Sequence, residues 1–363
     1  MIPTFPTDLA SILERVDRID PIAYGKTRNH LDGAVTYLSP YISRGVISTR
    51  QVLEAVLAKG HALRDIESFV KELCWRDYFQ RVQQHKDIDS DIRQPQHPVA
   101  HHDVPVALPT AQTGIEAIDD GIRRLYATGY MHNHMRMYTA MLACNIGRSH
   151  WREPARWMYS HLLDGDWASN ACSWQWVAGA NSSKTYIANQ ENINRFTGSR
   201  QAGSYLDTSY EALESIPIPE ALRDTTAFAL HTPLPATAPL RLDPAKPTLV
   251  YTSYNLDPFW HRDTDANRIL LLDPQVFERV PVSDRVMRFI LDLSQNIPGM
   301  QVFTGTFQSM KEEYGPDLIH FKEHPLNIGF SGIEEPRKWI STDVTGYFPS
   351  FFAYWKQVSR RFS

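Results

Sequence analysis

The stretch Leu162–Trp176, LLDGDWASNACSWQW, carries the most specific pattern in this chain of 363 residues. Asp164 and Asp166 flank a glycine where a helix is expected to begin, and carboxylates are favourable at a helix N-terminus. Asp166, Asn170 and Trp174 then recur every four residues, so they share one helix face. The pattern fits a capped helix with an aromatic core face, and it also fits a helix that presents a polar stripe to a ligand. A metal site at the two aspartates is disfavoured, because no histidine or further carboxylate stands at ligand spacing.

Two other stretches repeat this kind of pattern earlier in the chain. Each places a polar group, a guanidinium and an apolar side chain within one helical turn, so that all three share a helix face. The members are Glu72, Trp75 and Arg76 in KELCWRDYF, and Asn133, Arg136 and Met137 in GYMHNHMRMYTA. Taken alone, each stripe also fits an ordinary mixed helix surface with its apolar member in the core.

The spacing of apolar residues changes along the chain. Over residues 1–222 they recur at i, i+3, i+4 and i+7 in several segments, which predicts an all-helical domain. A proline-rich linker is expected over 223–246. Over 247–363, strand patterns such as TLVYTSY and MQVFTG alternate with helical ones, which predicts a small α/β Rossmann-like module with a parallel sheet and an aromatic helical tail. The expected fold class is therefore mainly α with a small C-terminal α/β module.

The composition is that of an ordinary globular protein with few cysteines. A net charge of −4 and 42% hydrophobic residues exclude a polycationic or disordered chain. Three cysteines without a CxxC spacing can neither build a disulfide framework nor ligate an iron–sulfur cluster. The sequence shows no signal peptide and no apolar run of about 20 residues, so we expect a cytoplasmic protein without membrane contact. Five of the nine tryptophans lie between Trp151 and Trp176, and this cluster needs an explanation.

Four motifs, taken in order, resemble those of the FAD-binding domain of the DNA photolyase/cryptochrome family. They are TYLSPYISRGVIST (36–49), ELCWRDYF (72–79), ATGYMHNHMRM (127–137) and LLDGDWASNACSWQW (162–176), with Tyr24 ahead of the first. The resemblance covers about residues 20–215 and implies an all-helical, photolyase-type cradle for FAD.

The resemblance assigns two groups of residues to FAD. They are Tyr24, Thr36, Leu38 and Ser39 at the phosphates and ribose, and Arg136, Asp164, Asp166 and Asn170 at the flavin. Arg136 and Asp164 would form a pair beside the flavin, and Asp166 would contact the flavin or the ribose. Asn170 would face flavin N5 and is counted as catalytic; family members that act as sensors often carry Asp or Cys there, so Asn favours repair. Val35 replaces a hydroxyl residue of the family motif.

A DNA-lesion pocket is implied in the same way. Its residues would be Glu72, Trp75, Arg76, Asn133 and Met137. A flipped-out dinucleotide needs an aromatic face to stack on, a cation for its phosphate and polar groups for its base edges. Glu72 would be catalytic, through a hydrogen bond to the pyrimidine carbonyl region. Members that repair (6-4) photoproducts typically carry a second histidine in the MHN motif, so Asn133 and Met137 favour the cyclobutane-dimer type.

The resemblance also gives the tryptophan cluster a role. Trp174 and Trp151 match the inner two members of the family's electron-transfer chain and are counted as catalytic. The usual outer tryptophan is absent, and its place could be taken by Tyr126, Tyr130, Trp157 or Tyr159. Trp167 and Trp176 are expected to be core residues.

The expected activity is that of a deoxyribodipyrimidine photo-lyase: light-dependent DNA repair in which reduced FAD (FADH−) donates an electron that splits cyclobutane pyrimidine dimers. The expected partner is UV-damaged DNA, and no metal or iron–sulfur cluster is expected. The segments LVYTSYNLDP and QVFTGTFQSMKEEYGPDLIHFKEHP resemble parts of the family's antenna domain, here relocated to the C-terminus. Because the usual arginine near the first strand is missing, a second antenna chromophore is not expected. The alternative is a cryptochrome-like blue-light sensor that binds FAD and signals through a protein partner.

Overall fold

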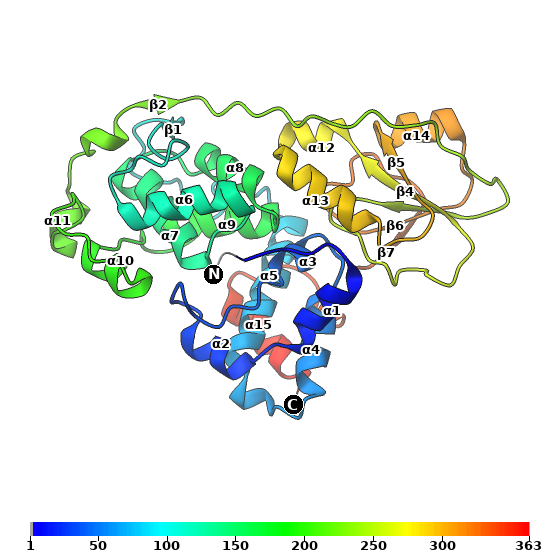
Figure 1. Cartoon of the computed structure of the whole chain (residues 1–363), viewed down its shortest axis with the longest axis horizontal. Coiled ribbons are helices and arrows are strands. Elements are labelled where there is room, and N and C mark those ends of the chain that lie inside the picture. The colour runs from blue at the N-terminus through cyan, green and yellow to red at the C-terminus, as the bar shows by residue number, and fades with distance from the viewer. Residues whose placement is uncertain (1–2, 363) are drawn as a thin grey trace. The chain divides into compact units, whose positions relative to one another are not determined.

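The computed structural model describes residues 3–362, and Figure 1 labels its helices and strands. The chain forms two compact units. Each unit is assembled from segments that lie far apart in the sequence. The segments are Asp20–Val35 and His85–Leu230 in unit 1, and Thr4–Ile19, Thr36–Gln84 and the residues from His231 onward in unit 2. The sequence-based boundaries at residues 222 and 246 stay a prediction.

Unit 1 is helical, as the apolar spacing predicts. Helices α7 and α8 both pack on α9, which carries the stripe of Asp166, Asn170 and Trp174. Two short strands, β1 and β2, pair in antiparallel fashion. The elements are α2 (Pro21–Thr27), β1 (Val104–Pro105), α6 (Glu116–Thr128), α7 (Asn133–Met141), the π-helix η2 (Leu142–Ile146), α8 (Arg152–His161), α9 (Trp167–Ala178), α10 (Gln190–Thr197), α11 (Tyr210–Glu214), η3 (Glu220–Leu222) and β2 (Thr225–Thr226).

Unit 2 combines helices from both ends of the chain with a sheet. Its helical elements are α1 (Leu9–Asp17), α3 (Ser39–Ser43), α4 (Thr49–Leu57), η1 (Leu63–Asp65), α5 (Glu67–His85), α12 (Pro274–Arg279), α13 (Asp284–Ser294), α14 (Phe307–Tyr314) and α15 (Phe351–Ser359). Within residues 3–362, no helix combines the length and the apolar character needed to cross a membrane.

The sheet of unit 2 has five parallel strands in the order β5-β4-β3-β6-β7, which confirms the predicted parallel sheet. The strands are β3 (Thr248–Tyr251), β4 (Asn267–Leu272), β5 (Met300–Thr304), β6 (Ile319–Lys322) and β7 (Ile333–Glu335). Side chains alternate between the two faces of a strand. Ile319 and Phe321 accordingly join Phe307 and Met310 of α14 in one apolar core, which leaves His320 on the opposite face.

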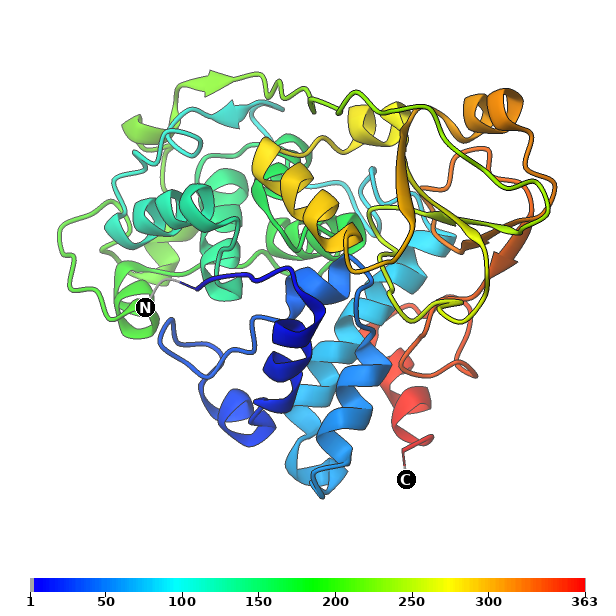
Figure 2. The ribbon, with the colours of Figure 1, turned by 45° about the vertical axis from the view of Figure 1, so that its right-hand side comes forward.

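The aromatic tail packs against a helix from the first quarter of the chain. The ring of Phe351, the first residue of α15, stacks on Trp75 of α5 with 3.8 Å between centroids and an interplanar angle of 9°. Tyr354 contacts Tyr78 in the same layer, at 5.9 Å between ring centroids. Figure 2 shows α15, in red, beside the blue helix α5. The predicted helix is therefore confirmed over residues 351–359, and its partner is α5.

A buried carboxyl group ties α5 to the segment before the tail helix. Asp77 accepts a hydrogen bond from the backbone N–H of Ile340 at 2.7 Å and one from Oγ1 of Thr49 at 3.0 Å. Burial raises the pKa of Asp77 to about 6, although both hydrogen bonds act in the opposite direction. The folded state therefore holds the proton of this group more tightly than the unfolded chain does.

An Asp77→Asn variant is expected to change how stability depends on pH. The stabilisation from the raised pKa is fully present below about pH 4 and is lost as the pH rises through about 6. The free energy of unfolding of the wild type should therefore fall relative to that of Asp77→Asn, by on the order of 2–3 kcal/mol between pH 4 and 7. Urea titrations at several pH values measure this difference. A difference that stays constant over that range would contradict the assignment.

Candidate functional site

The strongest polar feature of unit 1 is an ion pair between α7 and the turn before α9. The guanidinium NH2 of Arg136 donates to both carboxylate oxygens of Asp164, at 3.0 and 2.9 Å. The Asp164 side chain is 3% exposed and that of Arg136 is 22% exposed. Nε of Arg136 also donates to the carbonyl of Met131 at 2.8 Å. The expected pairing of Arg136 with Asp164 is present, and its geometry is fixed by a backbone contact.

Helix α9 begins at Asp166, as the sequence predicts. The Asp166 side chain caps the helix by accepting from the N–H of Ser169 at 2.7 Å. One turn later, Nδ2 of Asn170 donates to the carbonyl of Ala155 in α8 at 2.8 Å. Because that contact uses the amino end of the amide, the oxygen Oδ1 remains the hydrogen-bond acceptor of Asn170.

Two buried polar atoms near these residues lack a hydrogen-bond partner within residues 3–362. They are Nε2 of His132, just before α7, and Oγ of Ser169, next to Asn170. Burial lowers the pKa of His132 to about 4, so its imidazole is neutral near pH 7. A buried polar atom without a partner is costly in the folded state. The donors and acceptors here therefore fit a polar group that the protein binds, which is consistent with the ribose, phosphates or ring edge of FAD.

The tryptophans of unit 1 form a connected aromatic group. Trp151 is fully buried, and its Nε1 donates to Asp91 at 2.6 Å. Its ring centroid lies 6.4 Å from that of Trp167, and Trp167 in turn meets Tyr159 edge to face at 5.7 Å. Trp167 is buried, as expected. Its place between Trp151 and Tyr159 is not evident from the sequence, because Trp167 lies on α9 whereas Trp151 caps α8 and Tyr159 lies within α8.

The expectation that Trp176 is a core residue is wrong, since its side chain is 43% exposed. The reason is helical geometry. Trp176 follows the buried Trp174 by two residues, and two residues turn a helix by about 200°, which points Trp176 away from the packed face of α9. Of the candidates for the outer position, Trp157 is buried and donates from Nε1 to the hydroxyl of Tyr126 at 3.0 Å.

The residues expected at the phosphates and ribose belong to both units. Tyr24 lies within α2 of unit 1, whereas Thr36, Leu38 and Ser39 precede or begin α3 in unit 2. Leu38 is buried. Tyr37 between them has φ of +54°, an uncommon conformation for a residue other than glycine.

The residues expected at the DNA lesion are also divided between the units. Glu72, Trp75 and Arg76 lie on α5 of unit 2, where Arg76 donates to Oγ of Ser43 at 2.5 Å. Asn133 and Met137 lie on α7 of unit 1, the first exposed and the second partly buried. The stacking of Phe351 on Trp75 was not foreseen, because nothing in the sequence pairs α5 with the tail.

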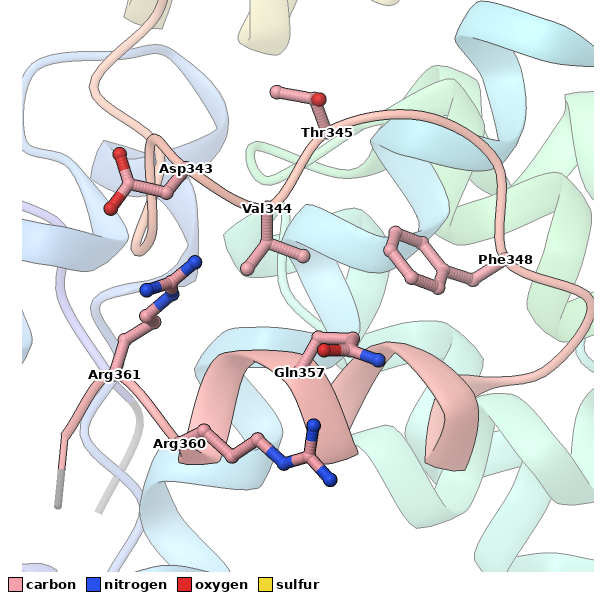
Figure 3. Close-up of a pocket in the computed structure, with 7 residues that line it drawn as sticks. All are labelled: Asp343, Val344, Thr345, Phe348, Gln357, Arg360 and Arg361. Carbon is pink, nitrogen blue, oxygen red and sulfur yellow. The ribbon is translucent and has the colours of Figure 1, made fainter.

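A pocket of about 430 Å³ lies elsewhere, in the C-terminal tail (Figure 3). Its lining residues are Asp343, Val344, Thr345, Phe348, Gln357, Arg360 and Arg361. None of the residues expected at FAD or at the lesion lines it.

The sequence matches a known protein family over a long internal segment. Residues 69–227 match the family model described as the FAD binding domain of DNA photolyase. This segment contains both stripes on α5 and α7 and all of α9, but it excludes Tyr24, Thr36, Leu38 and Ser39.

Several curated proteins named deoxyribodipyrimidine photo-lyase are similar to this chain over about 150 to 205 residues. The chain is 30% identical over 205 residues to the deoxyribodipyrimidine photo-lyase of Halobacterium salinarum, which covers 53% of this chain and 41% of that protein. It is 34% identical over 149 residues to the enzyme of the same name from Streptomyces griseus, covering 40% of this chain and 32% of that protein. The chain thus spans less than half the length of these relatives. Among solved structures, the cryptochrome of Synechocystis is 24% identical, with a TM-score of 0.48 over 54% of this chain and 44% of that one.

Proposed function

We propose that the chain belongs to the DNA photolyase/cryptochrome family and is a light-dependent DNA repair enzyme that acts on cyclobutane pyrimidine dimers, since residues 69–227 match the FAD-binding domain of DNA photolyase and the chain is similar to proteins named deoxyribodipyrimidine photo-lyase. The observation that supports this most is the partly buried Arg136–Asp164 pair beside the capped start of α9, all within the matched segment. The helical segments would form the photolyase-type FAD cradle, and the five-stranded sheet a Rossmann-like, antenna-like module. We expect no second antenna chromophore in this module, because the arginine that is usual near its first strand is missing.

The cofactor of this proposal is FAD, which when reduced supplies the electron that light transfers to the dimer. Arg136, Asp164 and Asp166 would hold the flavin end, with the unpartnered atoms of His132 and Ser169 as further contacts. Tyr24, Thr36, Leu38 and Ser39 would hold the phosphates and the ribose.

Asn170 is proposed to tune the flavin without adding charge. Its Nδ2 donates to the carbonyl of Ala155, so Oδ1 is the atom that would accept a hydrogen bond from the flavin N5–H. A neutral amide accepts this hydrogen bond without adding a charge, whereas an ionised aspartate would place a negative charge close to the flavin ring. This choice of residue supports repair over a cryptochrome-like sensor that signals through a protein partner, which is the second candidate.

Trp75 is proposed as the stacking surface for the flipped-out dimer, and Glu72, Arg76, Asn133 and Met137 are proposed as further contacts of the lesion. Stacking of a base on an aromatic side chain contributes about 1–3 kcal/mol. Phe351 already stacks on one face of Trp75, with the two rings nearly parallel. A dimer that uses this face has to displace Phe351, so a Phe351→Ala variant is expected to leave the proposed site accessible.

The proposal is tested with chemically reduced protein and an oligonucleotide that carries one thymine dimer. Blue light should restore the undamaged strand, and a Glu72→Ala variant should lose this activity while it retains FAD. Glu54→Ala is a matched control, because Glu54 is exposed and pairs with Arg50 on α4, outside the proposed site. Full repair by Glu72→Ala would contradict the role of Glu72, and no repair by the FAD-loaded wild type would favour the sensor.

A further inference from the structure

A cluster of two histidines and one glutamate lies in unit 2, and none of the residues proposed for FAD or DNA belongs to it. Nε2 of His261 and Nδ1 of His320 both contact the same carboxylate oxygen of Glu335, at 2.8 and 2.9 Å. One ligand atom from each of the three residues lies within 4.8 Å of the others. All three side chains are partly exposed, so a small ion could reach them from solvent.

The sheet brings two of these residues to one face. Glu335 of β7 is in register with Lys322 of β6, and His320 precedes Lys322 by two residues. Because side chains two apart along a strand share a face, His320 and Glu335 project to the same side of the sheet. Phe321, which lies between His320 and Lys322 on β6, belongs to the apolar core on the other side of the sheet.

Trp260 orients the carboxylate. Its indole Nε1 donates to Oε2 of Glu335 at 2.8 Å, which leaves Oε1 facing the two imidazoles. Burial alone would raise the pKa of Glu335, but the hydrogen bonds from Trp260, His261 and His320 together lower it. An outer contact of this kind, which fixes the direction of a ligating group, is common around protein metal sites.

His261 is held in an unusual backbone conformation. Its φ is +47°, and its carbonyl accepts from the guanidinium of Arg268 at 2.8 Å and from the N–H of Thr264 at 3.0 Å. A residue other than glycine in this region costs on the order of 1–3 kcal/mol and is retained where the surrounding contacts impose it. Here those contacts keep the imidazole within reach of Glu335.

The two neighbouring lysines have another carboxylate as their ion-pair partner. Lys322 and Lys338 both pair with Oδ2 of Asp257, at 3.1 and 3.0 Å. The histidines and the glutamate therefore form a set of three donors, two nitrogens and one oxygen, with the lysine charges directed to another carboxylate.

We infer that His261, His320 and Glu335 bind a zinc-class divalent metal ion in the α/β module. Two histidines and a glutamate are a known donor set for zinc, and three protein ligands leave one coordination position open. Bonds of about 2.0–2.1 Å in a tetrahedral site would separate the donor atoms by roughly 3.3 Å. The donor pairs at 2.8 and 2.9 Å therefore need to open by only a few tenths of an ångström.

The test is a metal titration of the full chain after treatment with a chelator and dialysis. Zinc should bind with a stoichiometry of one, measured by calorimetry and by elemental analysis of the dialysed complex. Cobalt added to the metal-free protein should give the visible absorption of a four-coordinate site in a difference spectrum. Zinc added afterwards should compete for the site and remove this absorption.

Three variants and one control decide between a metal site and a simple ion-paired cluster. Glu335→Gln and His320→Ala should abolish the binding, and Trp260→Phe should weaken it by roughly 10- to 100-fold through loss of the orienting contact. His231→Ala removes an exposed histidine outside the cluster and should bind as the wild type does. Far-UV circular dichroism of each variant confirms the fold. Absence of stoichiometric binding to the wild type, or equal affinity in Glu335→Gln and wild type, would overturn the inference.

Discussion

An Asp164→Asn variant is expected to lose its bound FAD and much of its stability. The variant keeps the shape of the side chain but removes the charge that pairs with Arg136 in two hydrogen bonds. Asp164 is buried but Arg136 is 22% exposed, so leaving the guanidinium without its carboxylate partner is expected to cost on the order of 1–3 kcal/mol. The freed guanidinium would also compete for the groups that hold the flavin. The ratio of flavin absorbance to protein absorbance after gel filtration measures the cofactor that remains.

Stability has to be measured separately from cofactor binding, because FAD bound only to the folded state adds stability of its own. Urea unfolding of the two apoproteins removes that contribution. The matched control is Asp120→Asn, in which the partner Arg123 and the aspartate are both well exposed. A pair of that kind contributes no more than about 1 kcal/mol. If Asp164→Asn retains FAD and unfolds at the same urea concentration as Asp120→Asn, the central role of the Arg136–Asp164 pair is refuted.

The helices and most strands could be predicted because each has a clear period in its own sequence. Helix α5 has apolar residues at helical spacing, and β4 is a short run of leucine and isoleucine. Strand β7 was missed, because Ile333–Glu335 holds one apolar residue and two glutamates. It forms a strand through its pairing with β6, which is a long-range contact that no local pattern reveals.

The candidate site could be predicted only where its residues share one helix or adjacent motifs. The stripe of Asp166, Asn170 and Trp174 follows from four-residue spacing alone. The stacking of Phe351 on Trp75 and the meeting of His261, His320 and Glu335 depend on how distant segments pack. The position of Trp176 was missed for a different reason, since a solvent-facing tryptophan runs against the usual preference for burial.

A Trp174→Phe variant is expected to bind FAD but to lose light-driven reduction of it. Trp174 lies one helical turn after Asn170 and is buried, so it is the tryptophan of α9 best placed to pass an electron to the proposed flavin site. Phenylalanine preserves an aromatic ring but is much harder to oxidise than indole. Absorbance of the bound flavin under blue light with an external reductant, compared with the wild type, measures the loss.

Trp176→Phe is the matched control, because it makes the same change two residues away on the exposed side of α9. It should photoreduce at the rate of the wild type. Trp151→Phe should lose photoreduction as Trp174→Phe does. Trp167→Phe tests whether electrons reach the flavin along the ring contacts from Tyr159 through Trp167 to Trp151, in which case photoreduction should also slow.

Chemical reduction separates the electron-transfer role from a structural one. Once FAD has been reduced with dithionite, Trp174→Phe should repair a thymine dimer as well as the wild type does, because the residue is proposed to supply electrons to FAD and not to touch DNA. Loss of repair in the chemically reduced variant would mean that Trp174 shapes the site instead. Photoreduction that is unchanged in both Trp174→Phe and Trp151→Phe would show that electrons reach the cofactor by another path, with Trp157 and Tyr126 the next side chains to replace.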